Sequence, residues 1–496
     1  MSLKDDACAL ASRCLNCADY PFPHSGKVIH DAVWGSIHLN RSEVALVDTI
    51  LLQRLRYLHQ TGFAFLTFPS ARHSRFEHSL GVLHQTDRHL RALQSRFREH
   101  VTDESVTVLR LAALLHDCSH GLFSHTSEEI YRFLPDTLEF TNEHGPYPAH
   151  KASELIARFI LESPAFQQAL DFLASRGAVH TSGKELTALI CGDYVAISPH
   201  DRWQVEIING PLDADKLDYI ARDGLHTGLP LSVDLDRLWL STEVQFLKKG
   251  CLKDIDQDQT RLVVNRSGIS AIEGILFARF QLTSAVYQHP KIRASDCVFK
   301  TWIEELQERD GSFKRTIDFV ESTDVNYTVV AGQRHRGELL KRALVISGRT
   351  VAPSDAETLP PVLITLVDEA NSTAAGASRL RSLAYKIAVE AKVPEEQRKL
   401  VWIDLPPFPK VQDLGLTIVN LGTPREPKFE YLEQVFPVPD WAKMFQHRNW
   451  RGHVFAPAKS LVAVGKAAFD VLGSELGLKI QNEALTWCKL EPPYSR

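Results

Sequence analysis

The chain has 496 residues, of which 44% are hydrophobic and 24% charged, and its formal net charge at pH 7 is -5. A chain of this length can bury a large core and usually forms more than one domain. The slight acidic excess gives no general reason to expect a nucleic-acid or membrane partner. No apolar run reaches the roughly 18 residues that cross a bilayer, and the first residues lack a signal-peptide core. We therefore expect a cytoplasmic protein.

Cysteine usage points the same way. The chain has 8 cysteines, and Cys14 and Cys17 form a C-x-x-C pair with Cys8 nearby. A zinc ribbon needs a second such pair, which the sequence lacks. We expect reduced thiols, as in the reducing cytosol. A local metal or redox site at this pair is the alternative.

The first part of the chain is predicted to be mainly helical. A weakly patterned leader covers residues 1–25, and apolar residues then recur at helical spacing up to about residue 310. Gly224 is expected to end one of these helices, because glycine often follows a last helical turn. The predicted helices are Glu43–Leu52, Glu77 to about Phe97, Ser105–His116, Ala152 to about Leu173, Asp213 to about Asp223, and Ile269–Tyr287.

The pattern changes after about residue 310, where short β-rich runs are separated by glycine and proline. Arg379–Ala391 is predicted to be a helix, as is Leu461 to about Leu476, and Leu405–Pro409 is a rigid connector. The second half is therefore predicted to be α+β. The predicted strands are Ala343–Ile346, Val362–Val367, Leu400–Ile403 and Leu416–Val419.

The most informative feature is the pair His116-Asp117 at the end of the apolar run Leu109–Leu115. The run predicts a buried helix. Burying an imidazole and a carboxylate there is costly without a partner, and a divalent metal ion is the simplest one. His78 and Asp215 lie on other predicted helices and could complete the ligand set. Their spacing permits this convergence without establishing it.

Histidine and carboxylate ligands together suit a borderline transition metal, Mn, Fe, Co, Ni or Zn, and also allow Mg. Four protein ligands leave positions open for water and a substrate oxygen. Water bound to such an ion loses its proton more readily and becomes a nucleophile near neutral pH. Taken alone, a His-Asp pair could instead be a structural hydrogen bond.

Further stretches accompany this pair. They are Gln53–Gly62 continuing into Phe68–Gly81, then His116–His125, then Asp213–Asp223, and finally Arg279 followed by Tyr287-Gln288-His289. With these motifs the chain resembles the HD-domain superfamily, and within it the deoxynucleoside triphosphate triphosphohydrolases. The resemblance covers roughly residues 30 to 300 and is far more specific than a lone His-Asp dipeptide.

The resemblance implies a mainly α fold. A helical HD catalytic core would occupy residues 26–310, and an α+β region over 311–496 would serve oligomerisation or regulation. The implied reaction is attack of water on the α-phosphorus of a deoxynucleoside triphosphate, which releases a deoxynucleoside and intact triphosphate. The implied partners are this substrate, further copies of the chain in a homo-oligomer, and a nucleotide effector.

Individual roles also follow from the resemblance. His125 would be the general acid that protonates the leaving 5′ oxygen, because the ordinary pKa of histidine lies near neutrality. Glu128 would orient His125, and His120 would lie near the phosphates. The implied metal ligands are His78, His116, Asp117 and Asp215. The implied substrate contacts are the cations Arg75, Lys216 and Arg279, the sugar contacts Tyr219, Asp223 and Tyr287, and Gln60 at the 3′ hydroxyl.

Each of these roles has a plainer alternative. Arg75 and Lys216 could form structural ion pairs with Glu77 and Asp218. Tyr219 could be a core residue. His120 and His125 could be helix-cap or surface histidines, and Arg279 and Gln60 could be solvated helix residues.

One departure from the family pattern follows the His-Asp helix. The family commonly has a His-Glu pair there, whereas this sequence has His150-Lys151, with His144-Gly145 as a competing candidate. We keep His150 as a candidate catalytic residue, and the substrate stays open. One alternative is an HD phosphohydrolase or phosphodiesterase acting on another nucleotide. The other is a nucleotide-sensing regulatory module without catalysis.

Overall fold

The structure is a computed structural model. It describes residues 2–15, 22–143, 152–177, 180–325, 327, 340–351, 358–409, 411–423, 425–481 and 484. The chain forms two compact units that alternate along the sequence. The first is Met1–Arg279, Arg315–Asp324 and Val411–Val438, and the second is Phe280–Lys314, Val325–Lys410 and Pro439–Arg496. The functional division predicted from the sequence, 1–25, 26–310 and 311–496, stays a prediction.

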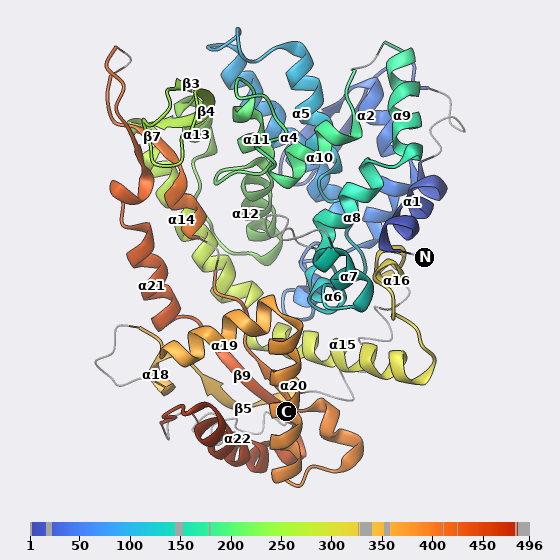
Figure 1. Cartoon of the computed structure of the whole chain (residues 1–496), viewed down its shortest axis with the longest axis vertical. Coiled ribbons are helices and arrows are strands. Elements are labelled where there is room, and N and C mark those ends of the chain that lie inside the picture. The colour runs from blue at the N-terminus through green and yellow to red at the C-terminus, as the bar shows by residue number, and fades with distance from the viewer. Residues whose placement is uncertain are drawn as a thin grey trace. The chain divides into compact units, whose positions relative to one another are not determined.

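The fold is mainly α, as predicted. The first unit is built around the buried helix α5, whose apolar residues pack against α4, α10 and α11 (Figure 1). Its helices are α1 Leu3–Cys14, α2 Arg41–Val47, α3 Ile50–Gln53, α4 Arg75–Gln94, α5 Asp103–Leu115, α6 His125–Tyr131, α7 Pro135–Glu143, α8 Ala152–Leu161, α9 Pro164–Ser175, α10 Gly183–Cys191, α11 Arg202–Ile208, α12 Ala214–Thr227, α13 Leu235–Ser241 and α16 Thr316–Glu321. Helix α14, Ile269–Leu282, begins in this unit.

Two small sheets, which the sequence patterns did not predict in full, also belong to the first unit. Strands β1, Lys27–Asp31, and β2, Gly35–Leu39, form an antiparallel hairpin. The second sheet has the order β3-β4-β7-β8, and β4 pairs in parallel with β7, so a late segment completes it. Its strands are β3 Thr242–Leu247, β4 Gln259–Asn265, β7 Ile418–Asn420 and β8 Phe429–Tyr431.

The second unit is α+β, with an antiparallel sheet of order β5-β9-β6. Helices α20 and α22 pack against this sheet around a core of buried aliphatic side chains (Figure 1). Its strands are β5 Leu340–Ile346, β6 Trp402–Asp404 and β9 Gly452–Pro457; its helices are α15 Pro290–Arg309, α18 Gly348–Val351, α19 Pro361–Ser372, α20 Ala374–Glu390, α21 Val438–Arg448 and α22 Leu461–Leu476.

The predicted helices at α4, α5, α14, α20 and α22 are confirmed, but two others are broken. Glu43–Leu52 is divided between α2 and α3 at Thr49, which is extended and donates its hydroxyl to the Leu46 carbonyl at 2.6 Å. Ala152–Leu173 is divided between α8 and α9. Pro164 has no N–H for a continuous helix, so it begins α9 instead, with Ser163 as the N-cap.

The predicted strand Val362–Val367 is wrong, because this segment lies in helix α19. Pro361 is the first residue of that helix, a position that proline favours. The buried residues are Leu363, Leu366, Val367 and Ala370. This spacing places one apolar stripe on a helix, and it outweighs the β-propensity of valine and isoleucine.

The predicted end of the helix at Gly224 is also wrong. Helix α12 continues to Thr227, and Gly228 ends it in the left-handed conformation with a φ of 73°. Gly224 has a different function inside the helix. A Cβ atom there would approach Leu231 Cδ1 to 2.8 Å, so glycine allows the following loop to pack closely.

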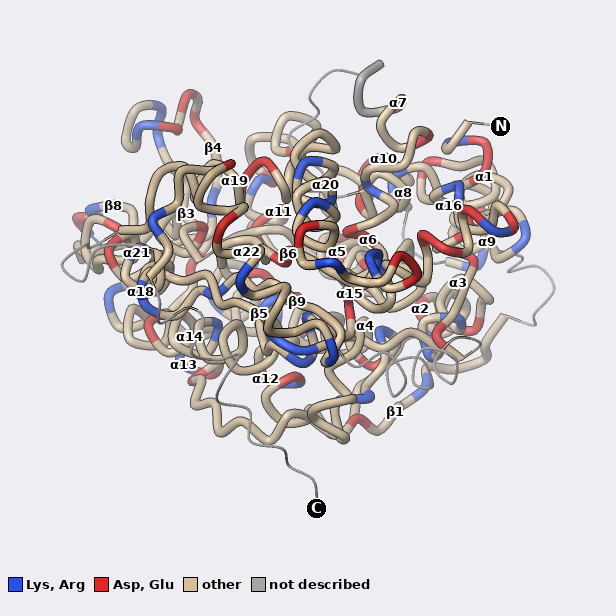
Figure 2. The backbone as a smooth tube through the Cα atoms, turned by 90° about the horizontal axis from the view of Figure 1, so that it is seen from below, with Lys and Arg blue, Asp and Glu red and all other residues tan. Residues whose placement is uncertain are grey.

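The predicted leader contains a packed helix, α1, which the sequence pattern did not predict. Ser2 and Asp5 form a capping box at its start, and Leu3, Ala7 and Leu10 are buried. Helix α1 carries charges of both signs (Figure 2), whereas α16 carries only the acidic Asp318 and Glu321; Arg315, which precedes α16, pairs with Asp6 at 3.2 Å. This ion pair offsets the positive charge of Arg315 with the negative charge of Asp6.

One helical stretch, Arg266–Tyr287, is long and apolar enough to cross a membrane by length and composition. The stretch contains the charged residues Glu273 and Arg279, and 50% of its most apolar 18 residues are buried within the protein. The core helix of a globular protein has the same properties. The cytoplasmic location stays a prediction.

Candidate metal centre

Three helices of the first unit carry the predicted metal ligands. His78 lies in the first turn of α4, which begins with a capping box between Ser74 and Glu77. His116 ends α5 and is followed by Asp117. Asp215 lies in the first turn of α12. The helices that carry His78 and Asp215 begin with side-chain caps, Ser74 and Asp213, so the chain there is fixed by capping as well as by packing.

The donor atoms of these residues converge. His78 Nε2 lies 3.0 Å from Asp215 Oδ1 and 3.7 Å from Asp117 Oδ2. His116 Nε2 lies 3.5 Å from Asp117 Oδ1. One donor atom each from His78, His116 and Asp215 lies within 4.8 Å of the others. Ligands bound at roughly 2.1 Å to one ion stand about 3 to 3.5 Å apart, so this spacing fits a common metal.

The two histidines are also prepared as ligands by their second nitrogen atoms. His78 Nδ1 lies 2.8 Å from Asp218 Oδ2, and His116 Nδ1 lies 2.8 Å from the Ala113 carbonyl oxygen. Both acceptors require the proton to be on Nδ1, which leaves Nε2 as the free donor atom. His116 Nε2 is buried and finds no hydrogen bond among the described residues. A metal ion is the partner that such an arrangement fits.

The electrostatics of the centre favour positive charge between these groups. Burial lowers the pKa of His78, but its hydrogen bonds to Asp215 and Asp218 outweigh burial and raise the pKa to about 10. Burial raises the pKa of Asp117, but Arg75, His116 and His120 hold it well below its usual value. A divalent cation would satisfy the same carboxylates.

A second donor group adjoins the first through Asp117. His120 Nε2 lies 3.3 Å from Asp117 Oδ1. Donor atoms of His120, His125 and Glu128 lie within 4.8 Å of one another. Burial, together with Arg75, lowers the pKa of His120 to about 4, so this ring is neutral near pH 7. The side chain of His125 is 59% exposed and can exchange protons with a ligand or solvent.

A strained turn holds His125 beside the centre. Phe123 and Ser124 precede it with φ values of 49° and 54°, a region that non-glycine residues rarely adopt. Arg75 Nε donates to Ser124 Oγ at 2.8 Å. His125 Nδ1 lies 3.1 Å from Glu128 Oε2. The other oxygen of Glu128 accepts from the hydroxyl of Ser153 at 2.8 Å, which fixes this carboxylate.

The predicted substrate cations have partners other than the ones the sequence suggested. Arg75 pairs with Asp117 rather than Glu77, and its buried Nη2 has no hydrogen bond within the described part of the chain. Lys216 Nζ lies 2.5 Å from Asp213 Oδ2 rather than pairing with Asp218. Arg279 donates to Asp413 Oδ1 at 2.9 Å, and Lys216 lies 3.8 Å from the other oxygen of Asp413.

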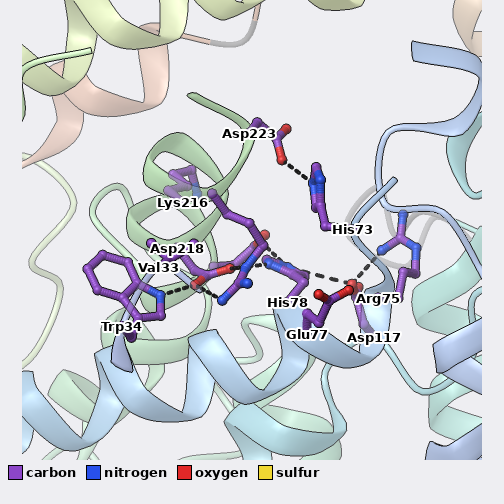
Figure 3. A network of polar contacts seen from close by, with 12 residues as sticks. Val33, Trp34, His73, Arg75, Glu77, His78, Asp117, Lys216, Asp218 and Asp223 are labelled. Atoms are coloured by element: carbon purple, nitrogen blue, oxygen red, sulfur yellow. Dashed lines mark hydrogen bonds and ion pairs between the residues drawn. The ribbon is translucent and has the colours of Figure 1, made fainter. Parts of the chain in front are cut away.

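The remaining predicted residues are less directly tied to the metal ligands. Asp223 Oδ1 lies 2.8 Å from Nε2 of the buried His73 (Figure 3). Gln60 is buried, and its Oε1 makes no hydrogen bond to any described residue. Tyr219 is half-buried on α12, and burial raises its pKa. Tyr287 belongs to the second unit. His150, Lys151 and His144 lie outside the described residues.

Sequence reasoning missed the groups that support the ligands. Asp218 lies in the stretch Asp213–Asp223 and was considered only as an ion-pair partner of Lys216, although it contacts His78 directly (Figure 3). A carboxylate one helical turn after Asp215 was the signal that could have identified it. Asp413 and Ser153 come from distant segments and carry no local signal.

Comparison with known proteins finds two family models that match parts of this chain. Residues 75–179 match the HD domain, and residues 251–483 match the HD associated region. The protein carries an HD domain. Together with the convergent histidine and carboxylate donors, this match identifies a divalent metal ion as the cofactor, and its identity stays open.

The relatives span archaea, bacteria and animals. The uncharacterised protein MJ1154 of Methanocaldococcus jannaschii is 26% identical over 465 residues, 92% of this chain and 86% of its own length. The deoxynucleoside triphosphate triphosphohydrolase SAMHD1 of Homo sapiens is 28% identical over 272 residues, 53% of this chain and 42% of its own length. This HD-domain protein thus spans less than half of that relative. The HD domain and the SAMHD1 relatives support a hydrolase.

A solved structure shares the fold. The crystal structure of a hypothetical protein from Aquifex aeolicus superposes with a TM-score of 0.59 and covers 89% of this chain and 99% of its own. Its sequence identity is 20%, so this likeness supports the fold alone.

Proposed function

We propose that this HD-domain protein hydrolyses deoxynucleoside triphosphates to a deoxynucleoside and inorganic triphosphate. The observation that carries the proposal is the bridge formed by Asp117. It lies between a metal-ligand group that includes His78 and a proton-transfer group that includes His125. The resemblance to SAMHD1, whose name states this activity, supports the choice of substrate.

His78, His116, Asp117 and Asp215 would hold the divalent ion. A divalent ion at such a site lowers the pKa of a bound water and supplies a nucleophile near neutral pH. The histidine and carboxylate set fits Mn, Fe, Co, Ni, Zn or Mg, so the native metal stays open.

Three cations would bind the triphosphate. Arg75 has a free Nη2 among the described residues and can present it to a phosphate oxygen while Nη1 stays on Asp117. Lys216 and Arg279 share Asp413 and would exchange this carboxylate for phosphate oxygens. Arginine can bind phosphate in bidentate fashion, and lysine acts as a point charge.

His125 would protonate the leaving 5′ oxygen. Glu128 accepts from Nδ1 of this ring, so Nε2 is the atom that would carry the transferred proton. His120, neutral and buried, would contact the phosphates as a hydrogen-bonding group. His150, which lies outside the described residues, is retained as a further candidate on the resemblance alone.

The sugar contacts are carried over from the family resemblance. Tyr219 and Asp223 would contact the deoxyribose, and a tyrosine against the 2′ carbon would reject a ribose sterically; Tyr287 is kept as a sugar contact on the resemblance alone. Gln60, with its unbonded Oε1 among the described residues, would bind the 3′ hydroxyl. A homo-oligomer and a nucleotide effector are proposed on the same resemblance.

A product assay tests the reaction. The purified protein is incubated with deoxynucleoside triphosphates, ribonucleoside triphosphates and cyclic nucleotides, each with Mn²⁺ or Mg²⁺, and the products are separated by ion exchange. We expect inorganic tripolyphosphate from the deoxynucleotides. Pyrophosphate or monophosphate as the product would contradict the proposal and favour a phosphodiesterase or another phosphohydrolase. Nucleotide binding without any product would favour a regulatory module.

Two matched variants control the assay. Asp215→Asn removes a proposed metal ligand without changing its size, and we expect it to abolish product formation. Asp236→Asn makes the same change at an exposed residue that pairs with Arg88 at 2.9 Å, and it should leave activity unchanged.

A further inference from the structure

The proposed metal ligand His78 forms a hydrogen bond, through its second ring nitrogen Nδ1, to a carboxylate that is completely buried. Asp218 has a relative exposure of 0% and accepts the Nδ1 proton of His78 through Oδ2. A carboxylate in such a place needs several hydrogen bonds to remain ionised. Its position therefore depends on the groups that bind its remaining lone pairs.

Arg222 supplies two of these hydrogen bonds. It lies one turn after Asp218 on α12, and its Nε donates to Oδ2 at 2.9 Å and its Nη2 to Oδ1 at 3.1 Å. The same guanidinium donates to both oxygens of Asp31, at 2.8 Å and 3.2 Å. A buried arginine is thus clamped between two carboxylates, and its orientation fixes that of Asp218.

Trp34 donates a further hydrogen bond to Asp218. Its indole Nε1 donates to Oδ1 of Asp218 (Figure 3). Trp34 stands in the turn between β1 and β2, and Asp31 holds this turn by accepting from the backbone N–H groups of Val33 at 3.0 Å and Trp34 at 2.9 Å. The hairpin is therefore connected to His78 by a continuous chain of hydrogen bonds.

Helix α4 leaves room for this chain at Gly81. A Cβ atom on Gly81 would lie 1.9 Å from Asp218 Oδ1 and 2.4 Å from Arg222 Nη2. Both groups are buried and fixed by other hydrogen bonds, so they could not both move aside at low cost. Glycine at this position, one turn after His78, is a requirement of the network.

We propose that Trp34, Asp31 and Arg222 are positioning residues for the metal ligand His78, and that they act through Asp218. They keep the Nδ1 proton of His78 directed at Asp218 and so present Nε2 to the ion. The inference rests on the metal site of the proposed function. It assigns the β1–β2 hairpin, which contributes no metal ligand, to the support of that site.

The test is the affinity of the full-length protein for Mn²⁺, measured from the free ion by electron paramagnetic resonance. Trp34→Phe removes the indole N–H and keeps an aromatic ring. Loss of a hydrogen bond behind a metal ligand typically weakens metal binding about 10-fold to 100-fold, and we expect the lower end here. Unchanged affinity in Trp34→Phe would overturn the inference.

Trp239→Phe is the matched control. Trp34 and Trp239 line the same cavity of about 790 Å³, but Trp239 Nε1 makes no hydrogen bond to the described residues. The same substitution there should leave the Mn²⁺ affinity unchanged. Equal weakening in both variants would show a packing effect and contradict a role through Asp218.

A second pair of variants gives an independent result if Trp34→Phe does not fold. Gly81→Ala displaces Asp218 by steric contact, and we expect it to weaken Mn²⁺ binding by up to about 100-fold. Gly274→Ala makes the same change in helix α14, where the added Cβ would meet only Ser232 O at 3.4 Å. Equal Mn²⁺ affinity in these two variants would also overturn the inference.

Metal affinity and product release separate the two proposals. If the wild-type protein releases no triphosphate but binds Mn²⁺ more tightly than both test variants do, the proposed reaction fails and the positioning role stands. If the wild-type protein releases triphosphate and both test variants bind Mn²⁺ as tightly as their controls, the positioning role fails and the reaction stands.

Discussion

Asp117 is the residue on which the chemistry of the centre depends most. Its carboxylate is ion-paired with Arg75, lies 3.7 Å from a ring nitrogen of His78, and lies 3.3 Å from one of His120. A single side chain thus contacts the proposed ligand group, the proposed phosphate-binding cation and the proposed proton-transfer group. Groups that share one carboxylate act together, so their substitutions should not be additive.

The proposed general acid gives a residue-scale prediction. His125→Ala should lower kcat by about 10²-fold to 10⁴-fold, the usual contribution of proton transfer by a positioned side chain. Mn²⁺ affinity should be unchanged, because His125 is outside the proposed ligand set. Steady-state kinetics and metal titration measure the two quantities.

His100→Ala is the control for this variant, since His100 lies on the same unit and contacts Glu99 at 4.0 Å. It should behave as the wild type. Full activity in His125→Ala would defeat the acid assignment while leaving the metal assignment intact.

His453 on β9 gives a second prediction, on acid stability. It is fully buried, neither ring nitrogen is hydrogen-bonded to a described residue, and burial lowers its pKa to about 3. The unfolded chain has a pKa near about 6.5 and binds the extra proton between these values. The free energy of unfolding therefore rises as the pH increases from about 3 to about 6.5. The protein loses this stability as the pH falls through the same range.

The measurement is urea unfolding at about pH 5 and about pH 7.5. The free energy of unfolding should differ between these two pH values by about 2 kcal/mol less in His453→Phe than in the wild type. Each pKa unit corresponds to about 1.4 kcal/mol. His24→Phe, at an exposed histidine, should leave the difference unchanged. An identical pH dependence in wild type and His453→Phe would contradict the prediction.

At the scale of elements, sequence patterns predict what is local. The apolar stripe of α5 and the His-Asp pair at its end were predictable, because periodicity and a costly burial are both visible in the sequence. Strands β1 to β4 were not, although β1 pairs with β2 and β3 with β4 as neighbours in the sequence; in β1 and β2 few residues are buried, so the apolar alternation typical of a strand is weak. The partner of Arg279 was also unpredictable, since Asp413 lies in a distant segment, whereas Asp213, the nearer partner of Lys216, lies only three residues before it.

Helix α19 shows how a local pattern can mislead, and it gives a third prediction. In a strand, Val362 and Leu366 would share a face; in the helix, Val367 is buried and Val362 is 42% exposed. Val367→Ala should lower the free energy of unfolding by about 2 kcal/mol, from two buried methyl groups and the cavity they leave. Val362→Ala should change it by less than about 0.5 kcal/mol. Urea unfolding measures the change in the free energy of unfolding for both variants. Equal changes would contradict the assignment of this segment to a helix.

At the scale of the whole molecule, the first unit is discontinuous in sequence. It includes Val411–Val438, which contributes β7 beside β4 and the carboxylate of Asp413. A fragment of residues 1–310 lacks all of these groups. The sheet of the first unit would then end at β4, with an unpaired edge.

This discontinuity gives a fourth prediction. The fragment 1–310 should lose the cooperative thermal transition of the full chain and be cleaved rapidly in limited proteolysis, whereas the full chain should resist. Circular dichroism and gel analysis measure both properties. A fragment with a cooperative transition and full protease resistance would show that Val411–Val438 is dispensable for folding.

The late return of the chain has a consequence for its synthesis. A ribosome makes the HD helices long before it makes β7, and the intervening residues, most of the second unit, must emerge in between. The proposed metal ligands are therefore translated early, but the sheet that completes their unit is translated late. The nascent chain stays without a finished catalytic unit until most of the polypeptide has left the ribosome.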